Sequence, residues 1–287
     1  MRFEKMHGLG NDFLVVDDRE SQPIDWPALS RRVCLRHTGV GADGILLIQP
    51  SDTADLRMRL FNADGSEAEM CGNGIRCVAE YVAVHGISGD RVVWETGAGP
   101  VVTERLGDDL VTVDMGPPRF APEAIPVDAP GLSEVIDQPL QVGGTTLQVS
   151  CVSMGNPHCV TVVDDVDSFP LHEIGPQVER HPRFPQRVNF EIVQVLSRTR
   201  VRQRTFERGV GETNACGTGA SAVGVAMQRL GLCDSPVTVE LRGGPLHIAW
   251  APGEPVRMTG PAQRVYTGHL MLQPTETLTA VPNRCFE

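Results

Sequence analysis

The chain has 287 residues, of which 41% are hydrophobic and 21% are charged. A chain of this length and composition can bury two cores, so two domains are the expected organisation. The formal net charge of -11 argues against a nucleic-acid or membrane-surface partner, because the arginines are spread along predicted elements and form no basic patch.

The N-terminal segment MRFEKMHGLGNDFLVV has charged residues where a signal peptide needs an uninterrupted apolar stretch. No apolar run is long enough to span a bilayer either, so we expect a cytoplasmic protein. In a reducing cytoplasm the eight cysteines are expected to be thiols and not a disulfide framework. Their spacing lacks the close pairs of a zinc site, and no metal is predicted.

The sequence repeats itself once, at an offset of 145 residues (216 − 71). The segment MCGNGIR around Cys71 aligns with ACGTGAS around Cys216. The same offset matches Gly10-Asn11 with Gly155-Asn156, Phe61 with Phe206, and Gly99-Pro100 with Gly244-Pro245. Abundant glycine alone does not produce such a series. It predicts two homologous halves, residues 1–117 and 118–263, with the tail 264–287 completing the first.

In the first half an alternating strand is predicted at Leu56–Phe61. It is followed by the Cys-Gly-x-Gly element and by a helix whose apolar residues recur from Ile75 to Val82, with Gly86 as its C-terminal cap. The next two strands are expected at Arg91–Glu95 and Val101–Arg105.

In the second half the corresponding strand is Val201–Phe206, and the helix from Ala220 to Met227 has almost no polar face, so protein must surround it. Two more strands are expected at Val237–Arg242 and Leu246–Trp250. The pattern predicts an α+β fold of two pseudo-symmetric domains. Each is a curved, barrel-like, mixed or antiparallel sheet wrapped around a central helix, with the active site in the interdomain cleft.

Cys71 and Cys216 each stand just before a predicted helix, with small glycines behind them. Free N–H groups and the helix dipole at that position favour an anion, which is expected to lower a thiol pKa and to bind a carboxylate. Two such ends facing each other would place a sulfur on each side of one α-carbon. This arrangement predicts inversion at a stereocentre, in which one thiolate removes the α-proton and the opposite thiol supplies another.

Backbone donors are predicted to stabilise the carbanion by binding its carboxylate, and one good donor is worth about 3 kcal/mol. These donors are Gly72, Asn73, Gly217 and Thr218. The two sulfurs are expected to work as a thiolate and thiol couple, because like charges in one site oppose each other. The other cysteines are predicted to be small core residues: Cys34, Cys77, Cys151, Cys159, Cys233 and Cys285.

Four long motifs resemble diaminopimelate epimerases. They are KMHGLGNDF from Lys5, FNADGSEAEMCGNGIRC from Phe61, SMGNPHC from Ser153 and FERGVGETNACGTGA from Phe206. The resemblance implies interconversion of LL- and meso-diaminopimelate in the synthesis of lysine and peptidoglycan precursors. It also implies that no pyridoxal phosphate, metal or other cofactor takes part, that the two cysteines are the bases, and that the protein is a homodimer.

The resemblance further implies which residues contact the substrate: Asn11, Asn62, Asn156, Asn189, Glu207 and Arg208. Arg208 is suited to the distal carboxylate and Glu207 to an ammonium group. His158 and Glu207 would tune the cysteine pKa values. Read without the resemblance, the loop asparagines cap turns, and Glu207 and Arg208 form a surface ion pair.

One position departs from the family pattern: Gly44 follows Asp43 where some members have glutamine, so a polar contact to substrate is absent there. No motif is recognised after Gln273. Two alternatives remain open. A racemase of another amino acid, such as histidine, could use the same scaffold, and a thiol redox or zinc-binding protein would need its cysteines close together.

Overall fold

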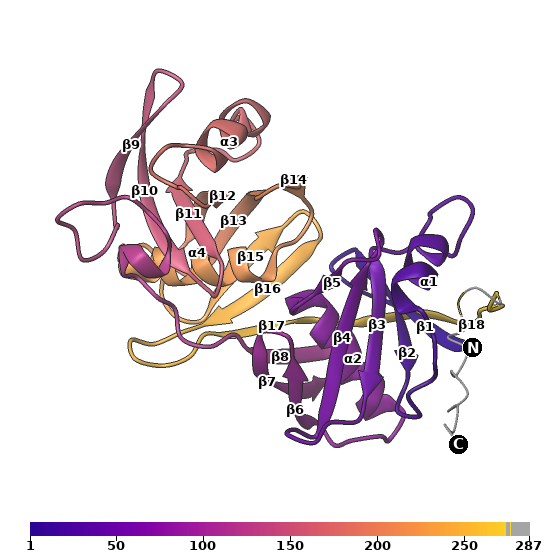
Figure 1. Ribbon diagram of the computed structural model, residues 1–287. Coiled ribbons are helices and arrows are strands. Elements are labelled where there is room, and N and C mark those ends of the chain that lie inside the picture. Colours follow the sequence, from indigo (N-terminus) through magenta and orange to yellow (C-terminus); the bar gives the residue numbers. More distant parts are fainter. Residues whose placement is uncertain (274–275, 277–287) are drawn as a thin grey trace, which may run out of the picture. The chain divides into compact units, whose positions relative to one another are not determined.

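A computed structural model describes residues 1–273 and residue 276 (Figure 1). The chain forms two compact units: unit 1 contains Met1–Asp109 and the segment from Ala262, and unit 2 contains Leu110–Pro261. The unit boundary precedes the repeat boundary predicted at residues 117 and 118. The reason is that β8 (Leu110–Asp114), the last strand of the first repeat, pairs with β17 (Arg257–Pro261) inside unit 2.

The sheet of unit 1 has the strand order β18-β1-β2-β3-β4-β6-β7. The β2–β3 and β4–β6 pairs are parallel and the others antiparallel, and the short β5 extends from β4. The bounds are β1 Arg2–Gly8, β2 Asn11–Asp17, β3 Gly44–Gln49, β4 Leu56–Asn62, β5 Glu67–Ala68, β6 Arg91–Thr96, β7 Gly99–Gly107 and β18 Gln263–His269.

The sheet of unit 2 follows the same plan, in the order β9-β10-β11-β12-β13-β15-β16-β17-β8. Its parallel pairs, β11–β12 and β13–β15, occupy the places of the two parallel pairs in unit 1. The remaining bounds are β9 Gln138–Val142, β10 Thr145–Ser153, β11 Pro157–Val162, β12 Asn189–Ser197, β13 Arg200–Glu207, β14 Gly211–Thr213, β15 Val237–Leu241 and β16 Gly244–Ala249.

Each sheet curves around one helix (Figure 1). Helix α2 (Gly72–Val84) contacts β1, β2, β3, β4 and β7, and α4 (Gly217–Arg229) contacts β10, β11, β12, β15, β16 and β17. Eleven of the thirteen α2 residues are buried, as expected for a helix with protein on every side. The predicted sheet wrapped around a central helix is confirmed in both units.

Two further helices lie outside the sheets and were not predicted. Helix α1 (Trp26–Val33) is capped by Asp25, whose carboxylate accepts from the Ala28 N–H at 3.0 Å, and it packs on β4. Helix α3 (Leu171–Glu179) packs on β12 and β13. Both are only about two turns long, so a helical period of apolar residues barely develops in the sequence. Their consequence is that β4 and β12 are each contacted by two helices, α1 and α2 for β4 and α3 and α4 for β12.

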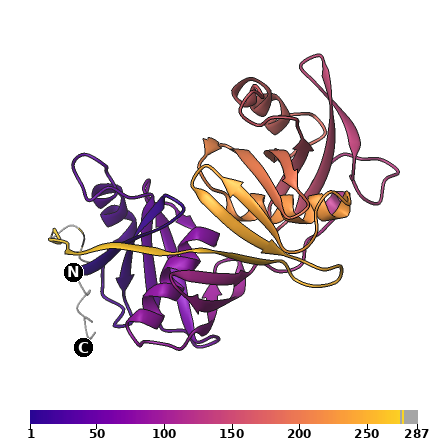
Figure 2. The same cartoon turned by 180° about the vertical axis from the view of Figure 1, so that it is seen from behind.

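The last described strand, β18, lies along β1 in unit 1 and is the yellow strand of Figure 2. The tail predicted to complete the first half, residues 264–287, therefore begins in this sheet, while residues 274–275 and 277–287 lie outside the described residues. Cys285, predicted to be a core cysteine, lies among them. No helix in the described part of the chain is long and apolar enough to cross a membrane.

Candidate active site

Cys71 and Cys216 occupy equivalent places, each as the N-cap residue of its central helix. Both have extended backbone angles, and the Sγ atoms accept a hydrogen bond from the third helical N–H, that of Gly74 at 3.5 Å and that of Gly219 at 3.3 Å. The predicted position of both cysteines at a helix start is confirmed. Because the sulfurs take only one N–H each, the other first-turn N–H groups remain available to an anion.

The two sulfurs differ in their surroundings. Cys71 is half-buried, whereas Cys216 is only 8% exposed. Burial raises the pKa of the Cys216 thiol well above its usual range, and the carboxylates of Glu207 and Glu191 raise it further. The expectation that the helix start lowers this thiol pKa is therefore wrong for Cys216. The hydrogen bonds from Thr218 and Gly219 do favour the thiolate, but burial and the two carboxylates disfavour it more strongly.

In unit 1 a polar network surrounds Cys71. The Asn11 Nδ2 donates to Asp43 Oδ2 at 2.7 Å, which turns the Asn11 Oδ1 towards Cys71. That oxygen accepts from the Cys71 thiol at 3.6 Å and from Asn73 Nδ2 at 3.3 Å. The buried Arg76 guanidinium in turn donates to Asn73 Oδ1 at 2.9 Å and to the Gly72 carbonyl at 3.0 Å. Asn11 and Asn73 are thus held beside the sulfur.

In unit 2 the corresponding network is built differently. Asn156 Nδ2 donates to Thr218 Oγ1 at 3.3 Å, and the Thr218 oxygen lies 3.4 Å from Cys216 Sγ. The other end of the Asn156 amide, Oδ1, lies 3.0 Å from His158 Nε2, while His158 Nδ1 lies 2.7 Å from Glu191 Oε1. His158 and Glu191 have no exposed surface. The structure therefore brings the predicted residues Asn156, His158, Cys216 and Thr218 together.

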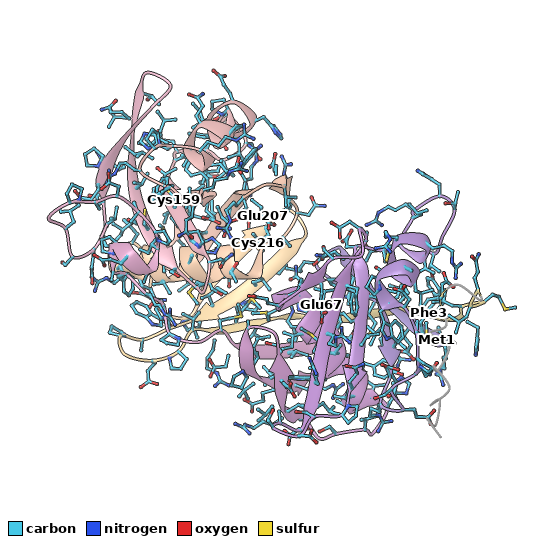
Figure 3. All side chains as sticks on the ribbon, in the orientation of Figure 1. Met1, Phe3, Glu67, Cys159, Glu207 and Cys216 are labelled. Atoms are coloured by element: carbon cyan, nitrogen blue, oxygen red, sulfur yellow. The ribbon has the colours of Figure 1, made fainter. Side chains whose placement is uncertain are left out.

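Glu207 belongs to the same group, and Figure 3 shows it beside Cys216. Burial raises the pKa of its carboxyl group, although the hydrogen bond that it accepts from Thr213 opposes the rise. The neighbouring Arg208 is exposed and donates from Nη1 to the Gln186 carbonyl at 3.1 Å. No ion pair joins Glu207 to Arg208 among the described residues, which leaves both charges available to a ligand.

Asn189 and Asn62 have structural partners of their own. Asn189 Nδ2 donates to the Pro157 carbonyl at 2.8 Å, and its Oδ1 accepts from the Arg208 N–H at 2.9 Å, so it holds the loop that carries Arg208. Asn62 Nδ2 donates to Ser66 Oγ at 3.0 Å within the turn that joins β4 to β5. For Asn62 the structure shows the turn contact that the sequence offered as the alternative to substrate binding.

Close packing of two strands explains why position 44 is a glycine. A Cβ atom there would lie 2.6 Å from the Phe61 carbonyl oxygen and 3.0 Å from a Leu60 methyl group. A backbone oxygen cannot move aside easily, so any side chain at this place requires β3 and β4 to separate. The departure from the family pattern at Gly44 thus matches the close pairing of these strands.

Two residues that orient the site were missed in the sequence. Glu191 alternates with the core residues Phe190 and Ile192 on β12, so the sequence pattern places it on the other, exposed face of the strand. Only the coverage of both faces, by α3 and α4, makes that position buried. The role of Asp43 in orienting Asn11 depends on a contact across 32 residues, which no local pattern indicates.

The other described cysteines are buried, as predicted for core residues: Cys34, Cys77, Cys151, Cys159 and Cys233. Burial raises the pKa of Cys77 to about 12, so it stays a thiol at neutral pH. Among the residues that the structure describes, no cysteine forms a disulfide bond, and no group of three or more His, Cys, Asp or Glu side chains is placed to hold a metal.

The fold is shared with a protein of low sequence identity. A Bacillus anthracis phenazine biosynthesis protein of the PhzF family superimposes with a TM-score of 0.69 at 16% identity, over 95% of this chain and 99% of that chain. The fold and the paired helix-capping cysteines define the class of protein: a duplicated two-unit α+β scaffold with one cysteine at the central helix of each unit.

The sequence comparisons specify the family within this class. The family model for diaminopimelate epimerase matches residues 3–121 and 150–265. A diaminopimelate epimerase of Pelotomaculum thermopropionicum is 49% identical over 275 residues, covering 93% of this chain and 98% of that protein. One from Moorella thermoacetica is 51% identical over 280 residues, covering 95% and 100%. The chain belongs to the diaminopimelate epimerase family.

Proposed function

We propose that this protein is an isomerase that interconverts LL- and meso-diaminopimelate in the synthesis of lysine and peptidoglycan precursors. The observation that supports the proposal is a pair of cysteines at equivalent helix starts. The chain that carries them is about half identical, over nearly its whole length, to proteins named diaminopimelate epimerase. The family match favours this substrate over histidine or another amino acid.

The proposed reaction uses Cys71 and Cys216 on opposite faces of one α-carbon. One sulfur, as a thiolate, takes the α-proton and becomes a thiol, and the other thiol gives its proton to the opposite face and becomes a thiolate. The negative charge of the intermediate spreads onto the substrate carboxylate. The N–H groups of Gly72, Asn73, Gly217 and Thr218 would stabilise it there, since they belong to the first turns of α2 and α4.

The raised pKa of Cys216 gives the two sulfurs different starting states in this proposal. Cys216 begins as the thiol, the form in which it supplies a proton to the α-carbon. Glu207 and His158 act as groups that tune the sulfur, because both lie in the charged cluster around Cys216. The predicted location of the active site in the cleft between the halves stays a prediction.

The remaining polar residues are proposed to bind the rest of the substrate. Arg208, whose guanidinium is exposed and bonded only to a carbonyl among the described residues, suits the distal carboxylate. The half-buried Glu207 suits an ammonium group. Asn11 and Asn156 offer amide groups beside the two helix starts. Asn189, the first residue of β12, and Asn62, the last residue of β4, are proposed as further substrate contacts.

We also propose a cytoplasmic homodimer. Strand β18 pairs only with β1 among the described residues, and it exposes Val265 at 56% and Tyr266 at 47% of their surface. An open strand edge with exposed apolar side chains can pair with a second copy of itself. Light scattering on the purified protein measures the assembly, and a monomer at all concentrations would exclude the dimer.

The proposed activity is tested by incubating LL-diaminopimelate in heavy water. The wild-type protein should place deuterium at one α-carbon as it forms the meso isomer, and Cys71→Ala and Cys216→Ala should each abolish turnover. Cys233→Ala, which removes a cysteine outside both networks, is the matched control and should keep the wild-type rate. Epimerisation by both catalytic variants at the wild-type rate would refute the two-base proposal.

A further inference from the structure

Glu191 is a fully buried carboxylate with an incomplete set of partners. Its Oε1 lies 2.7 Å from His158 Nδ1, whereas its Oε2 has no hydrogen-bond partner among the described residues. Burying a carboxylate with a bare oxygen opposes folding, by about 1–3 kcal/mol or more for each missing partner. A residue with such a cost is expected to contribute to function rather than to stability.

The Glu191–His158 pair exists in only one of the two repeats. At the offset of 145 residues the equivalent positions in the first repeat are Leu46 and Phe13. The scaffold around them is the same: a Cβ added at Gly219 would lie 2.8 Å from Glu191 Oε1, and one added at Gly74 would lie 3.0 Å from Leu46 Cδ2. The second repeat therefore has an ionic pair where the first repeat has two apolar residues, at a position that faces the helix start.

Both ring nitrogens of His158 face oxygen atoms. Nδ1 faces the Glu191 carboxylate and Nε2 faces Asn156 Oδ1 at 3.0 Å. A carboxylate and an amide oxygen only accept, so both contacts are hydrogen bonds when each ring nitrogen carries a proton. With a single proton, on Nδ1, the ring would accept at Nε2. The Asn156 amide would then have to turn its Nδ2 towards the ring.

A ring that donates from both nitrogens would hold Asn156 by its Oδ1 and so decide which end of Asn156 faces the helix start. Its Nδ2 group points to Thr218, next to Cys216. In unit 1 the equivalent Asn11 is turned the other way, because the Asp43 carboxylate takes its Nδ2 and leaves its Oδ1 beside Cys71. Equivalent asparagines thus present a donor in one repeat and an acceptor in the other.

We propose that Glu191 is a positioning residue that keeps His158 protonated on both nitrogens and thereby fixes Asn156 with its Nδ2 group directed to Thr218 and the substrate. The role of Asn156 in binding the substrate rests on the proposed function. An amino-acid α-carbon carries a carboxylate, which needs a donor, and an ammonium group, which needs an acceptor. The other ionisable groups close to this pair are Glu207 on β13 and Cys216 at the start of α4, and of these an ionised Glu207 also favours a cationic ring.

The protonation state is measured directly by nitrogen NMR of the histidine rings at neutral pH, in the protein without substrate. His158→Gln identifies the His158 signals by their loss. The wild type should show two protonated ring nitrogens, and Glu191→Gln should show one. Glu240→Gln, which removes a surface carboxylate of the same unit, is the control and should leave the signals unchanged. A singly protonated His158 ring in the wild type overturns the proposal.

Kinetics separate positioning from a merely structural role. Glu191→Gln should lower kcat/KM about tenfold at about pH 8, and much less below about pH 6, where an unassisted imidazole is protonated anyway. Glu191→Asp, which keeps the charge, should recover part of the loss. A loss of the same factor at every pH, or full activity of Glu191→Gln throughout, contradicts the proposal.

A second variant covers the case in which Glu191→Gln does not fold. Glu191→Leu combined with His158→Phe recreates the apolar pair of the first repeat, so it should fold while losing activity about tenfold, and wild-type activity in it contradicts the proposal. The NMR measurement requires no substrate. A wild-type protein with a doubly protonated His158 that does not epimerise diaminopimelate therefore refutes the proposed function and leaves the protonation of His158 established.

Discussion

Asp43 holds Asn11 in one orientation: its Oδ2 accepts from Asn11 Nδ2 at 2.7 Å and also from the Asp12 N–H at 3.1 Å. Since a carboxylate cannot donate, the Asn11 oxygen must face Cys71. Asp43 itself is fixed by the Arg36 guanidinium at 2.6 Å. Asn11 therefore enters the proposed reaction with its acceptor already placed.

We expect Asp43→Asn to lower kcat/KM, because the new amide can donate to Asn11 as well as accept from it and no longer fixes the orientation. One charged hydrogen bond is worth about 1.5–3 kcal/mol, which corresponds to a loss of roughly 10- to 150-fold. Steady-state kinetics with LL-diaminopimelate measure it. Asp17→Asn, which alters a partly buried carboxylate that is paired with Arg19 outside both networks, is the control. Equal activities of the two variants would show that Asp43 does not orient Asn11.

The ionisation of Cys216 should respond to Glu207. The pKa of this thiol is raised by burial and then by the Glu207 and Glu191 carboxylates, so the thiol form persists at a pH where an ordinary cysteine has ionised. Glu207→Gln removes one negative charge and should move the Cys216 pKa downwards. The pH dependence of alkylation by a neutral reagent, read by mass spectrometry of the Cys216 peptide, measures the shift. An unchanged or higher midpoint in the variant contradicts the assignment.

The glycines of the two Cys-Gly-x-Gly elements should differ in their tolerance of alanine. A Cβ at Gly219 meets the buried Glu191 carboxylate at 2.8 Å and Cys216 Sγ at 3.2 Å, whereas one at Gly74 meets mainly the flexible end of Leu46 at 3.0 Å. We expect Gly219→Ala to reduce kcat/KM at least tenfold and Gly74→Ala to reduce it less. The same assay on both variants compares them directly, and the reverse order would contradict the contact.

The stability of unit 1 depends on a buried polar pair away from the site. Trp94 Nε1 donates to Thr103 Oγ1 at 2.8 Å between β6 and β7, and both side chains are buried. Trp94→Phe leaves the hydroxyl without its donor and loses ring contacts, so it should lower the free energy of unfolding by about 1–3 kcal/mol.

Urea denaturation measures this effect, and Trp94→Phe combined with Thr103→Val isolates the hydrogen bond. The double variant should be no less stable than Trp94→Phe alone, because it removes the stranded hydroxyl together with its donor. A double variant in which the two losses simply add would show that the hydroxyl does not depend on Trp94.

The sequence was sufficient for the features that depend on local pattern. The helical period after Cys71, and its copy after Cys216, located both central helices, and α2 and α4 end just before Gly86 and Gly231 as expected. Strand alternation located the strands on either side of each helix. The fold class and the cysteine caps follow, because neighbouring residues alone determine a helix start and the direction in which it presents its N–H groups.

Contacts between distant segments decided the rest. The parallel register of β11 and β12 brings Glu191 to His158 across 33 residues, and no local pattern distinguishes that glutamate from an exposed one. The same holds for Cys216, whose burial and acidic neighbours reverse the pKa shift expected from its helix start. The charge environment of a side chain is the sum over everything packed around it, so it is fixed only once the chain has folded.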